Sequence, residues 1–155
     1  MQRLRALIRR FGPDQKGVQT VELALLLPVL FLITFGIIDF GRAYFSWVIV
    51  TNGAREGARS AAVGQTPAAV VTTVQGALSG LNVTSLQTGT CTTVTEGALC
   101  VNTTNAGGAP GAPVVVLVRY NFSFMILPNI ASWANGPALP GGVFPLTAQA
   151  TMRLE

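Results

Sequence analysis

A long apolar segment is the first pattern visible along the chain. Residues 23–38 are sixteen consecutive residues without a charged side chain. At a helical rise of about 1.5 Å per residue, they cover about 24 Å of a hydrocarbon core about 30 Å thick. Residues 18–21 and 43–50 can complete the span, so the pattern predicts a membrane helix over 18–50. A buried core helix of a soluble protein is the less favoured interpretation, because the run is apolar on all sides and follows a basic cluster.

The helical pattern continues beyond this span. Residues 43–63 contain no proline, so the helix can extend by about five more turns. Gly64 is typical of a helix C-cap and predicts the end. Small residues over 51–64 allow another element to approach closely. Two interpretations of this neck stay open: a solvated amphipathic helix with a small-residue face, or a neck packed under the following domain or against neighbouring subunits.

A second, shorter helix is predicted just after Gly64. Thr66 is typical of an N-cap, and Pro67 of the first helical position. Apolar residues at helical spacing then continue the pattern until Gly80.

The pattern past Gly80 changes to a period of two, which is typical of strands. It predicts a weak strand over 81–85 and strong strands over 114–124 and 146–154. Residues 105–113 and 131–145 are rich in Gly, Pro and Asn and are predicted to be loops. We therefore expect an α+β fold in which a long N-terminal helix carries a small antiparallel sheet.

The charges are few and unevenly placed. The chain has ten Lys or Arg, six Asp or Glu and no His, for a net charge of +4. Residues 1–17 contain five of the bases and one acid, whereas residues 18–155 contain five of each. The second part therefore has no basic field for nucleic acid. Bases ahead of the span predict a single-pass protein of the cytoplasmic membrane, with its N-terminus in the cytoplasm and its C-terminal domain outside.

The candidate chemistry of the C-terminal domain is sparse. The domain has no His, and Glu96 is its one acid apart from the C-terminal residue. It therefore offers no Ser-His-Asp set, carboxylate pair or metal cluster. Its paired glycines lack the strand-turn-helix context of a phosphate loop. We expect neither catalysis nor a cofactor or metal.

Cys91 and Cys100 are the two cysteines of the chain. Both lie in the part expected outside the cytoplasm, where disulfides persist. Gly97 between them permits a turn, so residues 91–100 can form a hairpin closed by a disulfide. Two free thiols are the alternative.

The segment Lys16-Gly17-Val18-Gln19-Thr20-Val21-Glu22 precedes the apolar run. A secretory signal peptide is cut after its apolar region, and the best small-residue site here, Ser60–Ala62, lies far beyond it. Here a basic residue is followed by a glycine, and an acid stands as the fifth residue after that glycine. This pattern resembles the leader of type IV pilins and pseudopilins. The resemblance implies that a prepilin peptidase cuts after Gly17 and leaves Val18 as the new N-terminus. Glu22 would then pair with the α-amine of a neighbouring subunit, which fixes register because either charge alone is unfavourable in a low-dielectric bundle.

Charged residues further along the helix form two groups. Asp39 and Arg42 are three apart and can pair, with an expected place at the outer membrane interface beside Tyr44 and Trp47. In the neck, Glu56 can pair with Arg59, and Arg55 lies on the same face as Arg59.

Three segments narrow the family. They are VELAL from Val21, FGIIDFGR from Phe35 and TNGAREGARSAAVG from Thr51. Together they resemble the TadE-like family, pseudopilins of the tight-adherence, type IV pilus-like system. Leu23 and Gly53 depart from the usual Phe and Ala, and the tail TAQATMRLE resembles the closing strand of the family. The N-terminal resemblance covers residues 16–64.

The resemblance implies a non-enzymatic pseudopilin or minor pilin with a pilin-like fold, associated with a pilus after processing. Its expected partners are prepilin peptidase, other pilin or pseudopilin subunits, the pilus assembly machinery and the membrane. The expected regions are a leader (1–17), a transmembrane helix (18–50), a neck (51–64) and a head (65–155). The alternative is a single-pass membrane protein that displays a binding or adhesion domain and never polymerises.

Overall fold

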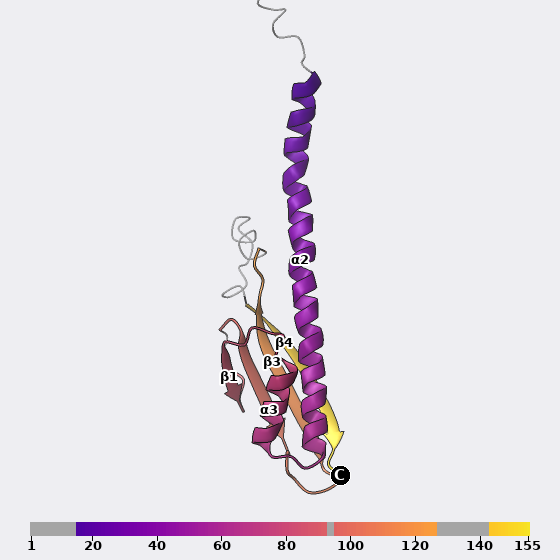
Figure 1. The fold of residues 1–155 in the computed structure, drawn as a ribbon, viewed down its shortest axis with the longest axis vertical. Coiled ribbons are helices and arrows are strands. Elements are labelled where there is room, and N and C mark those ends of the chain that lie inside the picture. Colours follow the sequence, from indigo (N-terminus) through magenta and orange to yellow (C-terminus); the bar gives the residue numbers. More distant parts are fainter. Residues whose placement is uncertain (1–14, 93–94, 127–142) are drawn as a thin grey trace, which may run out of the picture. The chain divides into compact units, whose positions relative to one another are not determined.

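A computed structural model describes residues 15–92, 95–126 and 143–155. Its elements, labelled as in Figure 1, are α2 (Gln15–Ala62), α3 (Pro67–Ala77), β1 (Ser85–Thr88), β2 (Ala98–Thr104), β3 (Pro113–Ser123) and β4 (Val143–Arg153). The chain forms two compact units, Met1–Ile38 and Asp39–Glu155. Helix α2 passes from the first unit into the second. The combination of one long helix and a small sheet confirms the predicted α+β class.

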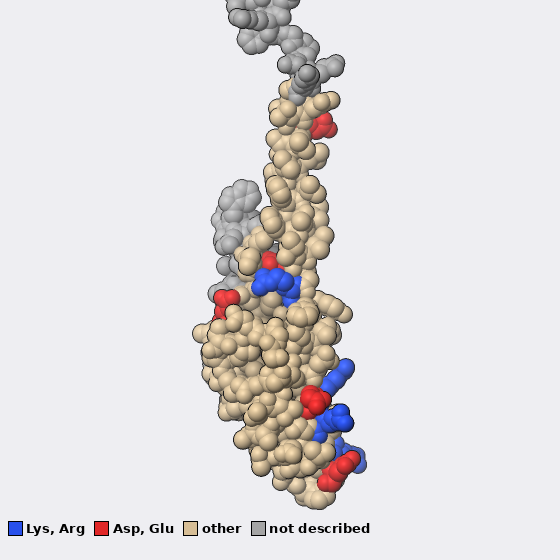
Figure 2. Space-filling view, in the orientation of Figure 1, with Lys and Arg blue, Asp and Glu red and all other residues tan. Residues whose placement is uncertain are grey.

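The first unit contains the apolar part of α2. This helix is the one in the described residues that is long and apolar enough to cross a membrane, and none of its most apolar window is buried. No charged residue lies between Glu22 and Asp39 in the sequence, and Figure 2 shows no charged side chain on the visible face of the apolar part of α2. Thr34, the hydroxyl residue within this stretch, donates its hydroxyl to the carbonyl of Leu30 at 2.8 Å. A helix that satisfies its own polar groups and exposes only apolar side chains is suited to lipid.

The end of α2 and the start of α3 follow the sequence prediction. Gly64 has φ +78°, the left-handed conformation typical of a residue just past a helix end. Thr66 caps α3, because its hydroxyl oxygen accepts a hydrogen bond from the nitrogen of Ala69 at 3.4 Å. Pro67 occupies the first helical turn, where its missing N–H leaves no bond unmade.

The four strands form one sheet in the order β1-β2-β3-β4. β3 pairs antiparallel with β4, as predicted, and also with β2, but β1 pairs parallel with β2. The sheet is therefore mixed, and the expected hairpin across residues 91–100 is wrong. Because the two strands are parallel, β2 starts at the same end of the sheet as β1, so the chain returns to that end before β2. Gly97 makes this return with φ +69°, and a Cβ there would lie 2.9 Å from the carbonyl oxygen of Asn82.

The strand predictions differ in how well they match. The alternation in β3 is confirmed: Val114, Val116 and Val118 are fully buried on one face. The weak strand expected over 81–85 lies further along, as β1. β2 was not predicted, because residues 98–101 are buried on both faces and show an unbroken apolar run in place of alternation.

β4 is confirmed and begins earlier than expected, at Val143. Pro145, placed in a loop by the sequence analysis, pairs with Asn121 within the sheet. It is tolerated because β4 is an edge strand, where a missing N–H need not break a ladder. Residues 131–142 of the expected loop lie outside the described residues.

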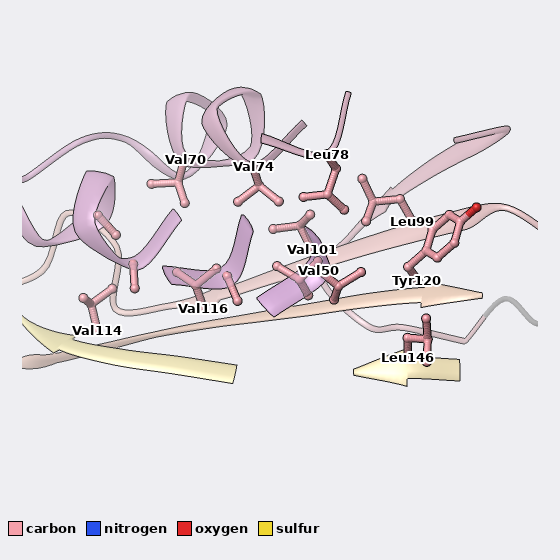
Figure 3. Packing of buried hydrophobic residues seen from close by; sticks show 14 of the residues in the cluster. Val50, Val70, Val74, Leu78, Leu99, Val101, Val114, Val116, Tyr120 and Leu146 are labelled. Carbon is pink, nitrogen blue, oxygen red and sulfur yellow. The ribbon is translucent and has the colours of Figure 1, made fainter. Parts of the chain in front are cut away.

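Both helices cover the same face of the sheet in the second unit. Val70, Val74 and Leu78 of α3 face Val101 of β2 and Val116 of β3, as Figure 3 shows. α2 approaches closely through glycine: a Cβ on Gly57 would lie 2.5 Å from Val74 Cγ2 and 3.1 Å from Val116 Cγ1. The small-residue face of the neck is thus packed against the head, and its charged face is solvated.

The C-terminal residues are tied to this core. Leu154 is buried, and its nitrogen donates to the carbonyl of Ala112 at 3.0 Å. The nitrogen of Glu155 donates to the carbonyl of Ala62 at 3.0 Å, which joins the tail to the end of α2.

Candidate functional site

The expected processing segment forms the first turns of α2. Gly17 and Val18 are helical and exposed. A Cβ added to Gly17 would meet no atom within 4 Å. The fold therefore has no need of glycine here, and alanine would favour the helix by about 0.5–1 kcal/mol. Any requirement for Gly17 must come from outside the folded chain.

Glu22 lies one turn beyond Val18, on the exposed apolar surface of α2. A shallow groove along this side of the helix is lined by Gly17, Val18, Val21, Glu22 and Leu25. Among residues 17–92, 95–126 and 143–155, no basic side chain forms an ion pair with Glu22. A carboxylate among lipid-compatible side chains is unfavourable unless it is compensated, so this acid is suited to a partner from outside the subunit.

Asp39 is only 1% exposed, and Arg42 pairs with it as predicted, with Nη1 3.6 Å from Oδ1. The same carboxylate accepts hydrogen bonds from the backbone nitrogens of Met125 at 3.3 Å and Ile126 at 2.9 Å. Sequence spacing shows pairs within one helix and has no signal for these two partners, which lie beyond the end of β3. Asp39 is therefore a buried tie between α2 and the segment that follows β3.

Aromatic side chains surround this tie. The guanidinium of Arg42 lies 5.5 Å from the ring centroid of Phe122, within cation–π range. The Phe40 and Phe124 rings are 6.0 Å apart and meet edge to face. The aromatics expected at the interface, Tyr44 and Trp47, are exposed and 6.0 Å apart.

The charged residues of the neck lie on its solvent side. Arg55, Glu56 and Arg59 are all exposed, and their neighbours Ala54, Gly57 and Ala58 are buried. The pairing that spacing allows between Glu56 and Arg59 is not among the ion pairs of the described residues. These three side chains are available to other molecules, and the fold does not use them.

The comparison with family models reports one match. Residues 17–59 match the family model described as TadE-like protein. This segment is TadE-like. The match begins at Gly17 and includes every charged helix residue discussed above, so the resemblance drawn from the sequence is confirmed for this part of the chain. Neither the curated proteins nor the solved structures contain a match to the chain.

The segment that matches the TadE-like family lies in the same helix that is long and apolar enough to cross a membrane. The match covers most of α2 and none of the sheet. Two features of the head lie outside this match. One is a cavity, which sequence reasoning did not place, and the other is the predicted Cys91–Cys100 disulfide, which the structure confirms.

The cavity has a volume of about 430 Å³ and lies between the TadE-like part of α2, the segment after α3 and β3. Arg42, Ser46, Glu96 and Tyr120 provide much of its polar lining. The Tyr120 hydroxyl donates to the carbonyl of Asn82 at 3.2 Å, and burial raises the pKa of Tyr120, with the Glu96 carboxylate adding to the effect and Arg42 opposing it. Glu96 accepts a hydrogen bond from Ser123. These groups hold the loop before β2 against β3.

The disulfide joins Cys91 to Cys100, with Cα atoms 5.6 Å apart. The carbonyl of Cys91 accepts a hydrogen bond from Arg119 Nη1 at 3.3 Å, and the Asn121 amide donates to the carbonyl of Thr95 at 3.1 Å. Arg119 and Asn121 point to the face of β3 opposite the helices. The disulfide therefore fixes the return loop against that second face.

Proposed function

We propose that this chain is a TadE-like pseudopilin or minor pilin that acts in the assembly of a Tad-type adhesion pilus. It is inserted with its N-terminus in the cytoplasm and its head outside, and a prepilin peptidase cuts it after Gly17. The subunit then enters a pilus-type assembly through α2, with other pilin or pseudopilin subunits and the assembly machinery as partners.

The observation that carries this proposal is that two residues at the start of an exposed apolar helix have no role in the fold. Gly17 has open space where a side chain would be, and Glu22 lies on a lipid-compatible surface. Neither residue contributes to the packing of the described chain. A peptidase that needs glycine before the cut, and a neighbouring subunit that supplies a positive charge, explain both.

Electrostatics supports the same order of events. Cleavage after Gly17 removes a segment of net charge +4 and creates one α-amine at Val18. In a helical bundle this amine is the complement of a neighbour's Glu22, and a misplaced subunit would leave both charges unpaired. The main effect of Glu22 would thus be to disfavour subunits in the wrong register, and its net contribution to the stability of the assembly would be smaller.

The oxidised Cys91–Cys100 pair supports the proposed topology, because disulfides persist outside the cytoplasm and are rare within it. The basic residues before the span favour the same orientation. The head, at about 90 residues, is small, and a disulfide compensates for its limited core.

The experiment is intact-mass analysis of the protein made with and without a prepilin peptidase. We expect a mature chain that begins at Val18 only when the peptidase is present, and no cleavage of Gly17→Ala. Gly36→Ala is the matched control, because Gly36 is also helical with no atom within 4 Å of its Cβ position. This variant should be cut normally. An intact Met1 in the presence of active peptidase, or a cut beyond Ile38, would contradict the proposal and favour a membrane-displayed domain that does not polymerise.

A further inference from the structure

One end of the head has an apolar edge, of which only Phe124 packs against the core. Four side chains form it: Phe40 of α2, Phe124 and Met125 just past β3, and Phe144 of β4; we call them the apolar rim. Phe124 joins the rim together, since its ring lies 6.0 Å from that of Phe40 and 6.4 Å from that of Phe144. Met125 is 67% exposed and Phe144 is 47% exposed. Three of the four rim side chains are therefore rings in contact, although they come from segments about 100 residues apart in sequence.

The rim begins in the sequence directly after the apolar part of α2. Within the predicted span of 18–50, residues 18–38 number twenty-one, and as a helix they alone extend about 31 Å, the thickness of a hydrocarbon core. Phe40 follows Ile38 by two residues. The carboxylate of Asp39 binds the backbone nitrogens of Met125 and Ile126, so the end of β3 is fixed to this same turn of α2.

The charges of the rim are suited to a headgroup layer. Asp39 and Arg42 neutralise each other, and Arg42 is 46% exposed beside the Phe122 ring. An arginine at this depth can extend to lipid phosphates while its stem stays among apolar groups. Aromatic rings are also favoured at the boundary between hydrocarbon and water.

The other end of the head differs in character. Charged side chains gather there along α2 and the end of β4 (Figure 2). They include Arg55, Glu56, Arg59, Arg153 and Glu155, all exposed. A polarity gradient therefore runs along β4, from the exposed ring of Phe144 to the exposed guanidinium of Arg153.

We propose that the apolar rim is a lipid-contact surface, seated in the headgroup layer of the outer leaflet before the subunit enters an assembly. The occupant is a phospholipid bilayer surface. The inference rests on the proposed membrane span and adds that the sheet itself, through Phe144 and Met125, contacts lipid.

Photo-crosslinking of the full chain in phospholipid vesicles tests this contact. p-Benzoylphenylalanine is introduced at Phe144 and, as the matched control, at Met152. Both positions lie on the same face of β4, and Met152 is also partly exposed, at 36%. Eight residues separate them, or about 27 Å along a strand. We expect protein–lipid adducts, detected by mass, to be at least about tenfold more abundant from position 144, because only that end reaches the headgroup layer.

Each outcome has a defined meaning. Equal or absent lipid adducts at 144 and 152 would overturn the inference, as would a covalent dimer as the main product at 144. The same probe at Ile33, an exposed span residue, shows whether the rim contact alone is wrong or the proposed membrane span is wrong as well. Lipid adducts at 33 without adducts at 144 reject the rim contact alone, and no adducts at 33 reject both. A probe at Met125 repeats the test if the change at Phe144 prevents formation of the Cys91–Cys100 disulfide.

Discussion

Asp39 Oδ2 lies 2.9 Å from the backbone nitrogen of Ile126, a residue 87 positions further along the chain. This contact joins a TadE-like helix to the end of a strand that the family match does not cover. The carboxylate has little exposure and also pairs with Arg42. One side chain thus connects the segment that matches the TadE-like family to a part of the chain outside that match.

Replacing Asp39 should loosen this connection. Hydrogen bonds to charged groups contribute about 1.5–3 kcal/mol, so we expect Asp39→Ala to lower the unfolding free energy of the head by about that amount. Asp39→Asn keeps one oxygen acceptor and should lose less. Urea unfolding of the full chain in detergent measures both. Glu56→Gln, an exposed acid on the same helix, is the control and should stay within about 0.5 kcal/mol of the unmodified chain. An unchanged midpoint for Asp39→Ala would show that the tie is not needed for the fold.

Only some of the contacts of Asp39 could be predicted from the sequence. Its pairing with Arg42 follows from a spacing of three residues on a helix, which is local and therefore predictable. Its bonds to Met125 and Ile126 depend on where β3 ends in three dimensions, and no pattern in the sequence encodes that. The same holds for the hydrogen bond from the Tyr120 hydroxyl to the Asn82 carbonyl, which joins residues 38 positions apart.

Gly57 should resist enlargement. A Cβ would lie 2.5 Å from Val74 Cγ2, so Gly57→Ala must move α2, α3 or β3. We expect a loss of about 1–3 kcal/mol in unfolding free energy, from overpacking, despite the better helix propensity of alanine. Gly76→Ala in α3 is the matched control, because nothing lies within 4 Å of its Cβ position. Thermal unfolding should show the control unchanged or stabilised, and a stabilised Gly57→Ala would contradict the packing of the neck.

The fold was predictable where a single face is buried and less so elsewhere. β3 and β4 alternate because only one of their faces is covered by helices, and Thr66-Pro67 marks a helix start by local chemistry. The residues of β2 are buried on both faces at its start, which removes the alternation. The parallel pairing of β1 with β2 depends on a return loop fixed by Gly97 and by the Cys91–Cys100 bond. A glycine between two cysteines is compatible with this loop and also with the hairpin expected over 91–100, so the sequence does not distinguish them.

Reduction of the disulfide should weaken the head without unfolding α2. Closing a loop with a sequence separation of nine residues contributes about 2–3 kcal/mol in the chain-entropy model. We expect reductant to lower the urea midpoint of the unmodified chain and to leave a Cys91→Ser/Cys100→Ser variant unaffected. Equal midpoints for the oxidised and reduced protein would show that other contacts, such as Arg119 with the Cys91 carbonyl, are enough to hold the return loop.

Tyr120 should make the head sensitive to alkali. Burial, with the Glu96 carboxylate, raises its pKa above the ordinary 10.0, so the unfolded chain loses this proton first. Stability from this group is complete below pH 10 and is lost as pH rises from there through the folded pKa. A Tyr44→Phe variant leaves Tyr120 as the one tyrosine, and its phenolate absorbance should appear above pH 10.0, the ordinary pKa. Titration at or below the ordinary value would contradict the cavity geometry.

Glu22 separates insertion from assembly. The apolar span does not depend on this side chain, so Glu22→Ala should reach the membrane fraction in normal amounts and be cut normally after Gly17. Assembly should fail, because the α-amine of Val18 on a neighbouring subunit would have no buried partner and a subunit out of register would no longer be rejected. Recovery of the protein in sheared pilus fractions measures this step. Glu56→Gln serves again as the control, since it removes an exposed acid from the same helix and should assemble normally. Normal assembly of Glu22→Ala would refute the register role while leaving the cleavage at Gly17 and the membrane span intact.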